Sequence, residues 1–231
     1  MLNYVYNSPR RLNRNPIEMS YHAPFVDAAI ASDETNFDNN FISYYYYGAA
    51  LGICLDLMIR KDYEGKSLDD VMKQLWQTHG KTEVPYEMPD LEAAVATITG
   101  DQAFAESFFR QYIYDSQLPD IAPLLSHFGL VVQPRSQEQV AFRAKMEFQA
   151  GRAMIKGNVP HGSALHQAGC VKGDVIQSIN DQPITNQDQL EVVTHGLKVG
   201  NSYPIQFVQN GIGTKGTFTA QADPRFAVKL A

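Results

Sequence analysis

The sequence predicts an α+β protein of two domains, with an N-terminal α-helical bundle over residues 1–132 and a small β-rich domain over residues 133–231. Apolar residues recur at helical spacing from residue 41 to residue 128, whereas beyond residue 133 short runs alternate between apolar and polar residues. The charge changes at the same place. Residues 1–130 carry 9 Lys and Arg against 18 Asp and Glu, and residues 131–231 carry 10 against 7.

The composition excludes several classes of protein. With 44% hydrophobic and only 19% charged residues, the 231-residue chain is folded rather than disordered. A net charge of -6 argues against nucleic acid as a partner, because a phosphate backbone is bound by clustered Lys and Arg. The uncharged, apolar stretch of residues 41–55 is too short to span a membrane, and the first thirty residues contain no signal segment. We therefore expect a soluble chain, whose two cysteines leave its compartment open.

The first half of the helical bundle consists of a segment without a clear period and a long apolar segment that follows it. Residues 1–40 lack a clear period, so we expect a wrapped segment with one short helix and a loop over 32–40. Residues 42–61 are apolar on nearly all sides, which predicts a helix inside the bundle. Its polar and small residues share one face, which either packs against a neighbouring helix or belongs to a site. These residues are Tyr45, Ala49, Gly52 and Asp56.

Capping residues delimit the other helices of the bundle. Ser67 can accept hydrogen bonds from the first free amides of the helix that follows it. Pro89 opens the next helix, which Gly100 ends by adopting a left-handed conformation. Asp101 and Asp120 each begin a further helix.

The second half of the chain has the pattern of a compact β-rich domain. Alternating apolar residues predict strands around 140–148, 175–179 and 205–207. Residues 185–195 have helical spacing, with Leu190 and Val193 facing inward.

Residues 159–180 closely resemble the core motif of bacterial PDZ domains, in which glycine turns flank a short helix and lead into a strand. The resemblance implies a peptide-binding domain that adds an extended peptide, usually a C-terminus, between a sheet edge and a helix. It places that helix at 185–195 and the carboxylate-binding loop at 139–142, where Ala141 replaces the usual glycine. The alternative is a structural PDZ domain packed on its neighbour. The peptide-binding residues implied are Gln139, Val140, Ala141, Phe142, Leu190 and Val193.

The whole chain resembles the C-terminal part of the glycyl aminopeptidase family. The matching segments are residues 7–10, the tyrosine-rich 42–50, the Leu-Asp and Ile-Arg pairs of 55–60, and the Ser-Leu-Asp-Asp-Val-Met run of 67–72. The family consists of zinc metallopeptidases with a thermolysin-like catalytic domain, and the helical bundle corresponds to the C-terminal lobe of that domain. The resemblance implies an aminopeptidase that removes N-terminal glycine or alanine residues from peptides.

The zinc motif of that family is missing from the sequence. None of the six histidines is followed by Glu, so the chain contains no H-E-x-x-H motif. We expect a fragment that begins after the metal-binding helices, binds no zinc, is inactive alone, and has the upstream part of the catalytic domain as its partner. Zinc would be the cofactor of the parent enzyme.

One catalytic residue is implied by the resemblance. In related aminopeptidases, a tyrosine three residues before a motif glycine donates a hydrogen bond to the oxyanion of the reaction, and Tyr45 has that position relative to Gly48. Tyr47 replaces the motif lysine. Tyr44 and Tyr46 are the competing candidates and are expected to be core residues.

Two other functions compete with the aminopeptidase. The chain could act alone as a non-catalytic PDZ peptide-binding module. A PDZ-bearing serine protease is the weaker hypothesis, because Ser163 belongs to the PDZ turn and the helical half offers no Ser-His-Asp set.

Overall fold

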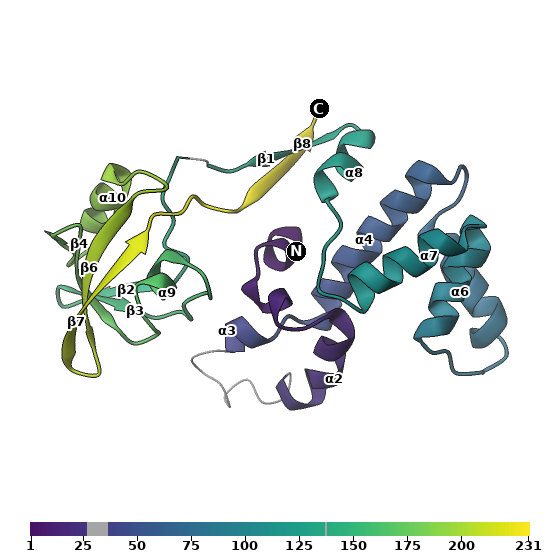
Figure 1. The fold of residues 1–231 in the computed structure, drawn as a ribbon, viewed down its shortest axis with the longest axis horizontal. Helices are drawn as coiled ribbons and strands as arrows, with labels where there is room; N and C mark the ends of the chain where they lie inside the picture. The colour runs from purple at the N-terminus through teal and green to yellow at the C-terminus, as the bar shows by residue number, and fades with distance from the viewer. Residues whose placement is uncertain (27–36, 137) are drawn as a thin grey trace.

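The computed structural model describes residues 1–26, 37–136 and 138–231. It confirms the α+β class: a helical domain is followed by a domain built on a β-sheet (Figure 1). Within the described residues, none of the helices is long and apolar enough to cross a membrane.

The N-terminal segment is more helical than its composition predicts. Its described elements are α1 (Leu2–Tyr6), the 3-10 turn η1 (Pro9–Leu12), α2 (Pro16–Val26) and α3 (Phe37–Asn40). The prediction of one short helix is therefore wrong. Helices α1 and α2 pack the buried residues Val5 and Met19 in one cluster with helix α4 (Tyr44–Asp62) instead of following a period of their own. Residues 32–36 of the expected loop lie outside the described residues, and residues 37–40 form α3.

The rest of the helical domain follows the predicted segmentation. Gly100 ends α6 in the left-handed conformation, with φ 70°, and Asp101 accepts a hydrogen bond from the Phe104 amide at 2.9 Å to cap α7. Asp120 caps α8 through the Ala122 amide at 3.1 Å. The elements are α4 (Tyr44–Asp62), α5 (Leu68–Leu75), the π-helical turn η3 (Trp76–Gly80), α6 (Met88–Thr99), α7 (Gln102–Phe108), the π-helical turn η4 (Phe109–Ile113) and α8 (Ile121–His127).

The predicted cap of α5 is wrong in one respect. Ser67 is the N-cap residue, but its hydroxyl donates to the Asp70 carboxylate at 2.7 Å and makes no capping bond to a backbone amide. The carboxylate of Asp56, on α4, instead accepts the hydrogen bond of the Leu68 amide at 2.8 Å. The capping group of α5 therefore comes from the neighbouring helix α4. A local sequence pattern could not show this contact.

The prediction that helix α4 lies inside the bundle is also wrong. One side of it is buried, including Tyr47, Leu51 and Ile59. The opposite side, which carries Tyr45 and Ala49, is exposed to solvent. An apolar composition predicts burial only if enough neighbouring elements are present, and in this chain α4 has neighbours on one side.

The β domain contains an antiparallel sheet with strand order β2-β3-β4-β6-β7, and β5 also pairs with β4. The sheet packs with α9 and α10 around one core, which includes Ile179, Phe207 and Phe218. The elements are β2 (Met146–Gln149), β3 (Arg152–Ile155), α9 (Ala164–Gln167), β4 (Val175–Ile179), β5 (Gln182–Pro183), α10 (Gln187–Gly196), β6 (Ser202–Gln209) and β7 (Ile212–Thr219).

Two predicted elements of this domain differ from the structure. The alternation from residue 140 to 148 forms a strand only at β2, while Val140 makes an isolated antiparallel bridge to Ala222. The apolar residues Phe142, Ala144 and Met146 still pack against the core, but residues 141–145 form no strand. The helix expected at 185–195 is α10, which begins after the N-cap Asn186, and Leu190 and Val193 are buried as predicted.

The C-terminal strand returns to the helical domain. Strand β8 (Phe226–Leu230) pairs antiparallel with β1 (Leu130–Pro134), directly after α8, and Figure 1 shows this two-stranded ribbon between the two domains. The side chain of Asn3 in α1 extends the ribbon, because it donates to the Phe226 carbonyl at 2.7 Å and accepts from the Phe226 amide at 2.8 Å. The chain therefore crosses between the domains twice, and the boundary at residue 132 stays a prediction.

Candidate functional site

Tyr45 lies in the first turn of α4 and is the most exposed of the four consecutive tyrosines, with 70% of its surface accessible. The centre of its ring lies 4.4 Å from the centre of the Tyr44 ring, so Tyr44 packs against one side of it. Within the described residues, its hydroxyl makes no hydrogen bond. The phenol is therefore free to donate to a group that approaches the open face of α4.

The other tyrosines occupy different environments. Tyr44 is partly buried in the cluster formed with α1 and α2, as expected of a core residue. Tyr46 is 52% exposed and packs edge-on against Tyr4, so the expectation that it belongs to the core is wrong. Consecutive helical residues point about 100° apart, so a run of four tyrosines necessarily reaches both buried and open sides.

Tyr47 is the fully buried tyrosine of the run, and its hydroxyl has no hydrogen-bond partner in the described structure. Burial raises the pKa of Tyr47 to about 12, with Asp115 acting in the same direction and Arg11 opposing it. Tyr47 is thus a neutral core residue and supplies no charge to the open face of α4.

The open face of α4 continues beyond Tyr45. A methyl group added at Gly48 would meet no atom within 4 Å, and Ala49 is exposed. At Gly52 the face closes, since an added methyl group would lie 3.8 Å from Leu68. Asp56 is engaged there by Arg60 at 2.8 Å and by the Leu68 amide. Asp56 is therefore a structural residue, and the open stretch consists of the first two turns of the helix.

The β domain has a groove of about 300 Å³ between the β2 side of the sheet and α10. Three of the predicted peptide-binding residues line it: Gln139, Phe142 and Leu190. Val140 and Val193 are instead buried in the core, at 3% and 5% exposure. Ala141 does not line the groove, and its amide donates to the Gln221 carbonyl at 3.0 Å. That amide is therefore already used within the domain.

Sequence reasoning missed several groove residues. Spacing could have found them, because positions 142, 144 and 146 share one side of an extended segment, and positions 187, 190, 191 and 194 share one side of a helix. The additional lining residues are Ala144, Met146, Gln187, Glu191, Thr194 and His195.

No group of three or more His, Cys, Asp or Glu side chains that could hold a metal ion occurs in the described part of the chain. His161 and His166 come together, with rings 4.4 Å apart, and burial lowers the pKa of His166, with His161 adding to the effect. Ser163 is buried and caps α9 by accepting from the His166 amide at 3.3 Å. The described residues therefore do not by themselves fit a zinc ion.

Comparison with known proteins supports the fold. No protein-family model matches the chain, and no curated protein matches it. The crystal structure of an aminopeptidase N family protein from Idiomarina loihiensis is similar over 99% of this chain, with a TM-score of 0.79 and 22% identity. The chain spans 41% of the length of that protein.

Two solved proteases are similar over a smaller part. The match with the HtrA-type protease AlgW with decapeptide covers 38% of this chain and 30% of the protease chain, with 15% identity and a TM-score of 0.35. The match with a serine endoprotease from Yersinia pestis covers 37% of this chain and 30% of the protease chain, with 21% identity and a TM-score of 0.33. The chain thus has the fold of about two fifths of the Idiomarina protein, a helical domain followed by a β domain.

Proposed function

We propose that this chain is the C-terminal part of a zinc aminopeptidase of the glycyl aminopeptidase type, with a PDZ domain at its end. The observation that carries the proposal is the similarity of nearly the whole chain to an aminopeptidase N family protein that is more than twice as long. In this proposal the helical domain forms one wall of the catalytic cleft, and upstream residues hold the zinc, which would supply Lewis-acid chemistry to the substrate carbonyl.

The exposed start of α4 fits this role. Tyr45, Gly48 and Ala49 present a phenol beside small residues, so an extended substrate could approach the helix closely. Tyr45 would donate a hydrogen bond to the oxygen that gains negative charge as the peptide carbonyl is attacked. A phenol suits this step because it donates a proton in hydrogen bonding while remaining neutral near pH 7.

The test uses a longer chain that includes the upstream region of the same reading frame. We expect it to bind zinc and to cleave glycyl and alanyl chromogenic substrates, while the 231-residue chain does neither. In the longer chain, Tyr45→Phe should lower kcat by about 100-fold or more with zinc content unchanged, because it removes one oxyanion donor. Tyr46→Phe is the matched control and should leave kcat within about twofold, since a surface substitution outside the site has little effect. Equal losses in both variants would contradict the role of Tyr45.

A second candidate function is peptide binding by the β domain alone. The groove between β2 and α10 favours it, because β2 is an edge strand whose outer side is open to an added strand. We expect a peptide with an apolar C-terminal residue to shift the amide resonances of Met146 and Glu191. If no peptide shifts these resonances, the β domain serves as a structural element between its neighbours.

A further inference from the structure

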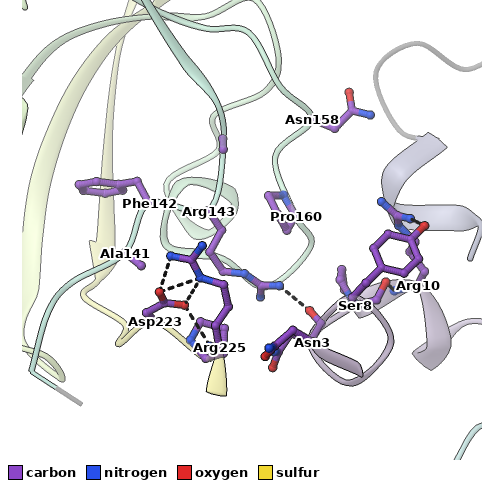
Figure 2. A pocket seen from close by; sticks show the side chains of 15 residues that line it. Asn3, Ser8, Arg10, Ala141, Phe142, Arg143, Asn158, Pro160, Asp223 and Arg225 are labelled. Atoms are coloured by element: carbon purple, nitrogen blue, oxygen red, sulfur yellow. Dashed lines mark hydrogen bonds and ion pairs between the residues drawn. The ribbon is translucent and has the colours of Figure 1, made fainter. Parts of the chain in front are cut away.

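A cavity of about 520 Å³ lies between the two domains, apart from the groove and from the open face of α4. Its walls come from α1, η1 and the two residues between them on one side, and from residues 141–144, Asn158, Pro160 and residues 223–225 on the other. Figure 2 shows Arg143 extending from the β-domain side toward the N-terminal helix. The cavity therefore exists only where both domains are in place.

Direct hydrogen bonds between the domains hold these walls in position. The Arg143 guanidinium donates to the Asn7 carbonyl at the end of α1. Asn3 bonds to both backbone groups of Phe226, and within the helical domain it also accepts a hydrogen bond from the Asn7 side chain at 3.1 Å. Asn39 donates to the Val159 carbonyl at 2.9 Å and accepts from the His161 amide at 2.8 Å. A ligand would thus enter a site that is already formed, which limits the entropy lost on binding.

The walls carry an excess of positive charge. Three arginines, Arg10, Arg143 and Arg225, line the cavity with one acidic residue, Asp223. Two of the arginines are engaged: the Arg225 Nε donates to the two Asp223 oxygens at 2.9 and 2.8 Å, and Arg10 lies 5.0 Å from the centre of the Tyr4 ring. The third, Arg143, forms no ion pair within the described residues.

Arg143 is partly buried, and its acceptor is the neutral carbonyl of Asn7. Burial lowers the pKa of Arg143, although the charge of Asp223 opposes this effect. A guanidinium removed from water and held by a neutral acceptor gains more from an anion than an exposed one does, since its hydration is already reduced. Its planar arrangement of donors matches the two oxygens of a carboxylate.

We propose that this interdomain cavity binds a carboxylate-bearing ligand, with Arg143 as the residue that holds the carboxylate. A single negative charge fits better than a phosphate dianion, because Asp223 lies in the same wall. The apolar rings of Pro9, Phe142 and Pro160 provide contacts for the carbon atoms of the ligand. Binding of such a ligand would join the two domains, since its site is divided between them.

The cavity and the groove adjoin at the same segment, residues 142–144. Phe142 and Ala144 line both, whereas Arg143 lines only the cavity. The two sites are therefore distinguishable by mutation, and the proposal does not depend on the peptidase function. A small free acid and the C-terminus of a peptide share the chemistry that Arg143 would recognise.

The experiment measures binding of N-acetylalanine, of the tripeptide acetyl-Ala-Ala-Ala, of their C-terminal amides and of inorganic phosphate to the 231-residue chain. Calorimetry gives affinities, and amide resonances of Asn7, Arg143 and Arg225 locate the site. We expect at least one of the free acids to bind at least about tenfold more tightly than its amide, because a charge-assisted hydrogen bond is lost. If the tripeptide binds more strongly than N-acetylalanine, the carboxylate comes from the C-terminus of a peptide. If the two bind equally, the ligand is a small acid.

Three variants complete the test. Arg143→Gln should weaken carboxylate binding at least about tenfold, and Arg143→Lys should weaken it less, because the charge remains but the planar donor pair is lost. Arg152→Gln, an exposed site in β3, removes the same charge outside the cavity and should change nothing. If Arg143→Gln does not fold, the affinity of Arg143→Lys for the free acids and the affinity of the unchanged chain for the amides still test the proposal. Equal binding of acids and amides, unchanged binding by Arg143→Gln or Arg143→Lys, preference for phosphate, or resonance shifts confined to β2 and α10 would overturn the proposal.

Discussion

The two domains bury their apolar residues in different ways. In the described part of the β domain, one core cluster joins the sheet to helices α9 and α10. In the described part of the helical domain, the buried residues instead form three separate clusters. The helical domain also exposes large aromatic side chains, among them Tyr21, Phe25, Tyr45 and Trp76. The β domain is thus closed by its own residues, whereas the helical domain presents surfaces suited to contact with other protein.

The largest effect should come from the single core of the β domain. Phe207→Ala removes a side chain that is 1% exposed and should lower the free energy of unfolding by about 3–5 kcal/mol, through lost burial and the cavity left behind. Phe25→Ala, at a side chain that is 71% exposed in the helical domain, should change it by less than about 0.5 kcal/mol. Urea denaturation followed by circular dichroism measures both. Similar losses would show that Phe25 is as well packed as Phe207.

Alanine substitutions at two glycines, one in each domain, should change the stability of the chain in opposite directions. A methyl group at Gly216 in β7 would lie 2.2 Å from the Ala168 carbonyl oxygen, so Gly216→Ala should destabilise the chain by about 1–3 kcal/mol. At Gly48 on the open face of α4 there is space, and Gly48→Ala should stabilise the chain by about 0.5–1 kcal/mol because it favours the helix. Thermal unfolding of both variants tests this. Destabilisation by Gly48→Ala would indicate that α4 is more enclosed than described.

Asn39 tests how strongly the domains are joined. Asn39→Ala removes its two hydrogen bonds to residues 159–161 and should cost about 1–2 kcal/mol in the free energy of unfolding. Hydrogen exchange at the His161 amide should become faster in the same variant. Asn13→Ala is the control, because Asn13 donates to the Asn39 carbonyl at 3.1 Å within the helical domain. Accelerated exchange at His161 in the control as well would mean that the whole N-terminal segment, rather than this side chain, holds the contact.

The smallest effect concerns Asp223, near the junction of the domains. Hydrogen bonds from Arg225 lower the pKa of Asp223 in the folded state. The resulting stabilisation is present above the unfolded-state pKa of about 3.9 and is lost as the pH falls through the lower folded-state pKa. Asp223→Asn should therefore lower stability at pH 7 and make it less dependent on pH below about 4. Unfolding measured between pH 2 and pH 7 would show this, and parallel curves for both chains would contradict it.

Much of the fold could be predicted from local residue chemistry. The caps Asp101 and Asp120, the left-handed Gly100 and the buried pair Leu190 and Val193 all depend on interactions within a few residues. Predictions that depended on distant neighbours were less accurate. The sequence predicts that the Ser67 side chain caps α5, but the carboxylate of Asp56, on α4, accepts the hydrogen bond of the Leu68 amide instead. Spacing alone could not reveal that contact.

The candidate site divides in the same way. The position of Tyr45 in a motif predicts a role in catalysis, which stays a prediction, although Tyr45 is 70% exposed in the structure. Of the residues predicted to bind a peptide, Gln139, Phe142 and Leu190 line the groove, whereas Val140 and Val193 belong to the core and do not line it. The amide of Ala141 is bonded to Gln221, a residue about eighty positions away, which a sequence pattern does not record.

The sequence by itself determined the two-domain α+β order, most helix ends and the alternation of buried and exposed residues, because these follow from the periods of helices and strands. Only the tertiary structure decided that α4 is open on one side, that β8 returns to pair with β1, and that Arg143 reaches the end of α1. These features depend on which distant segments lie side by side. Such contacts are set by the packing of whole domains, and no single segment encodes them.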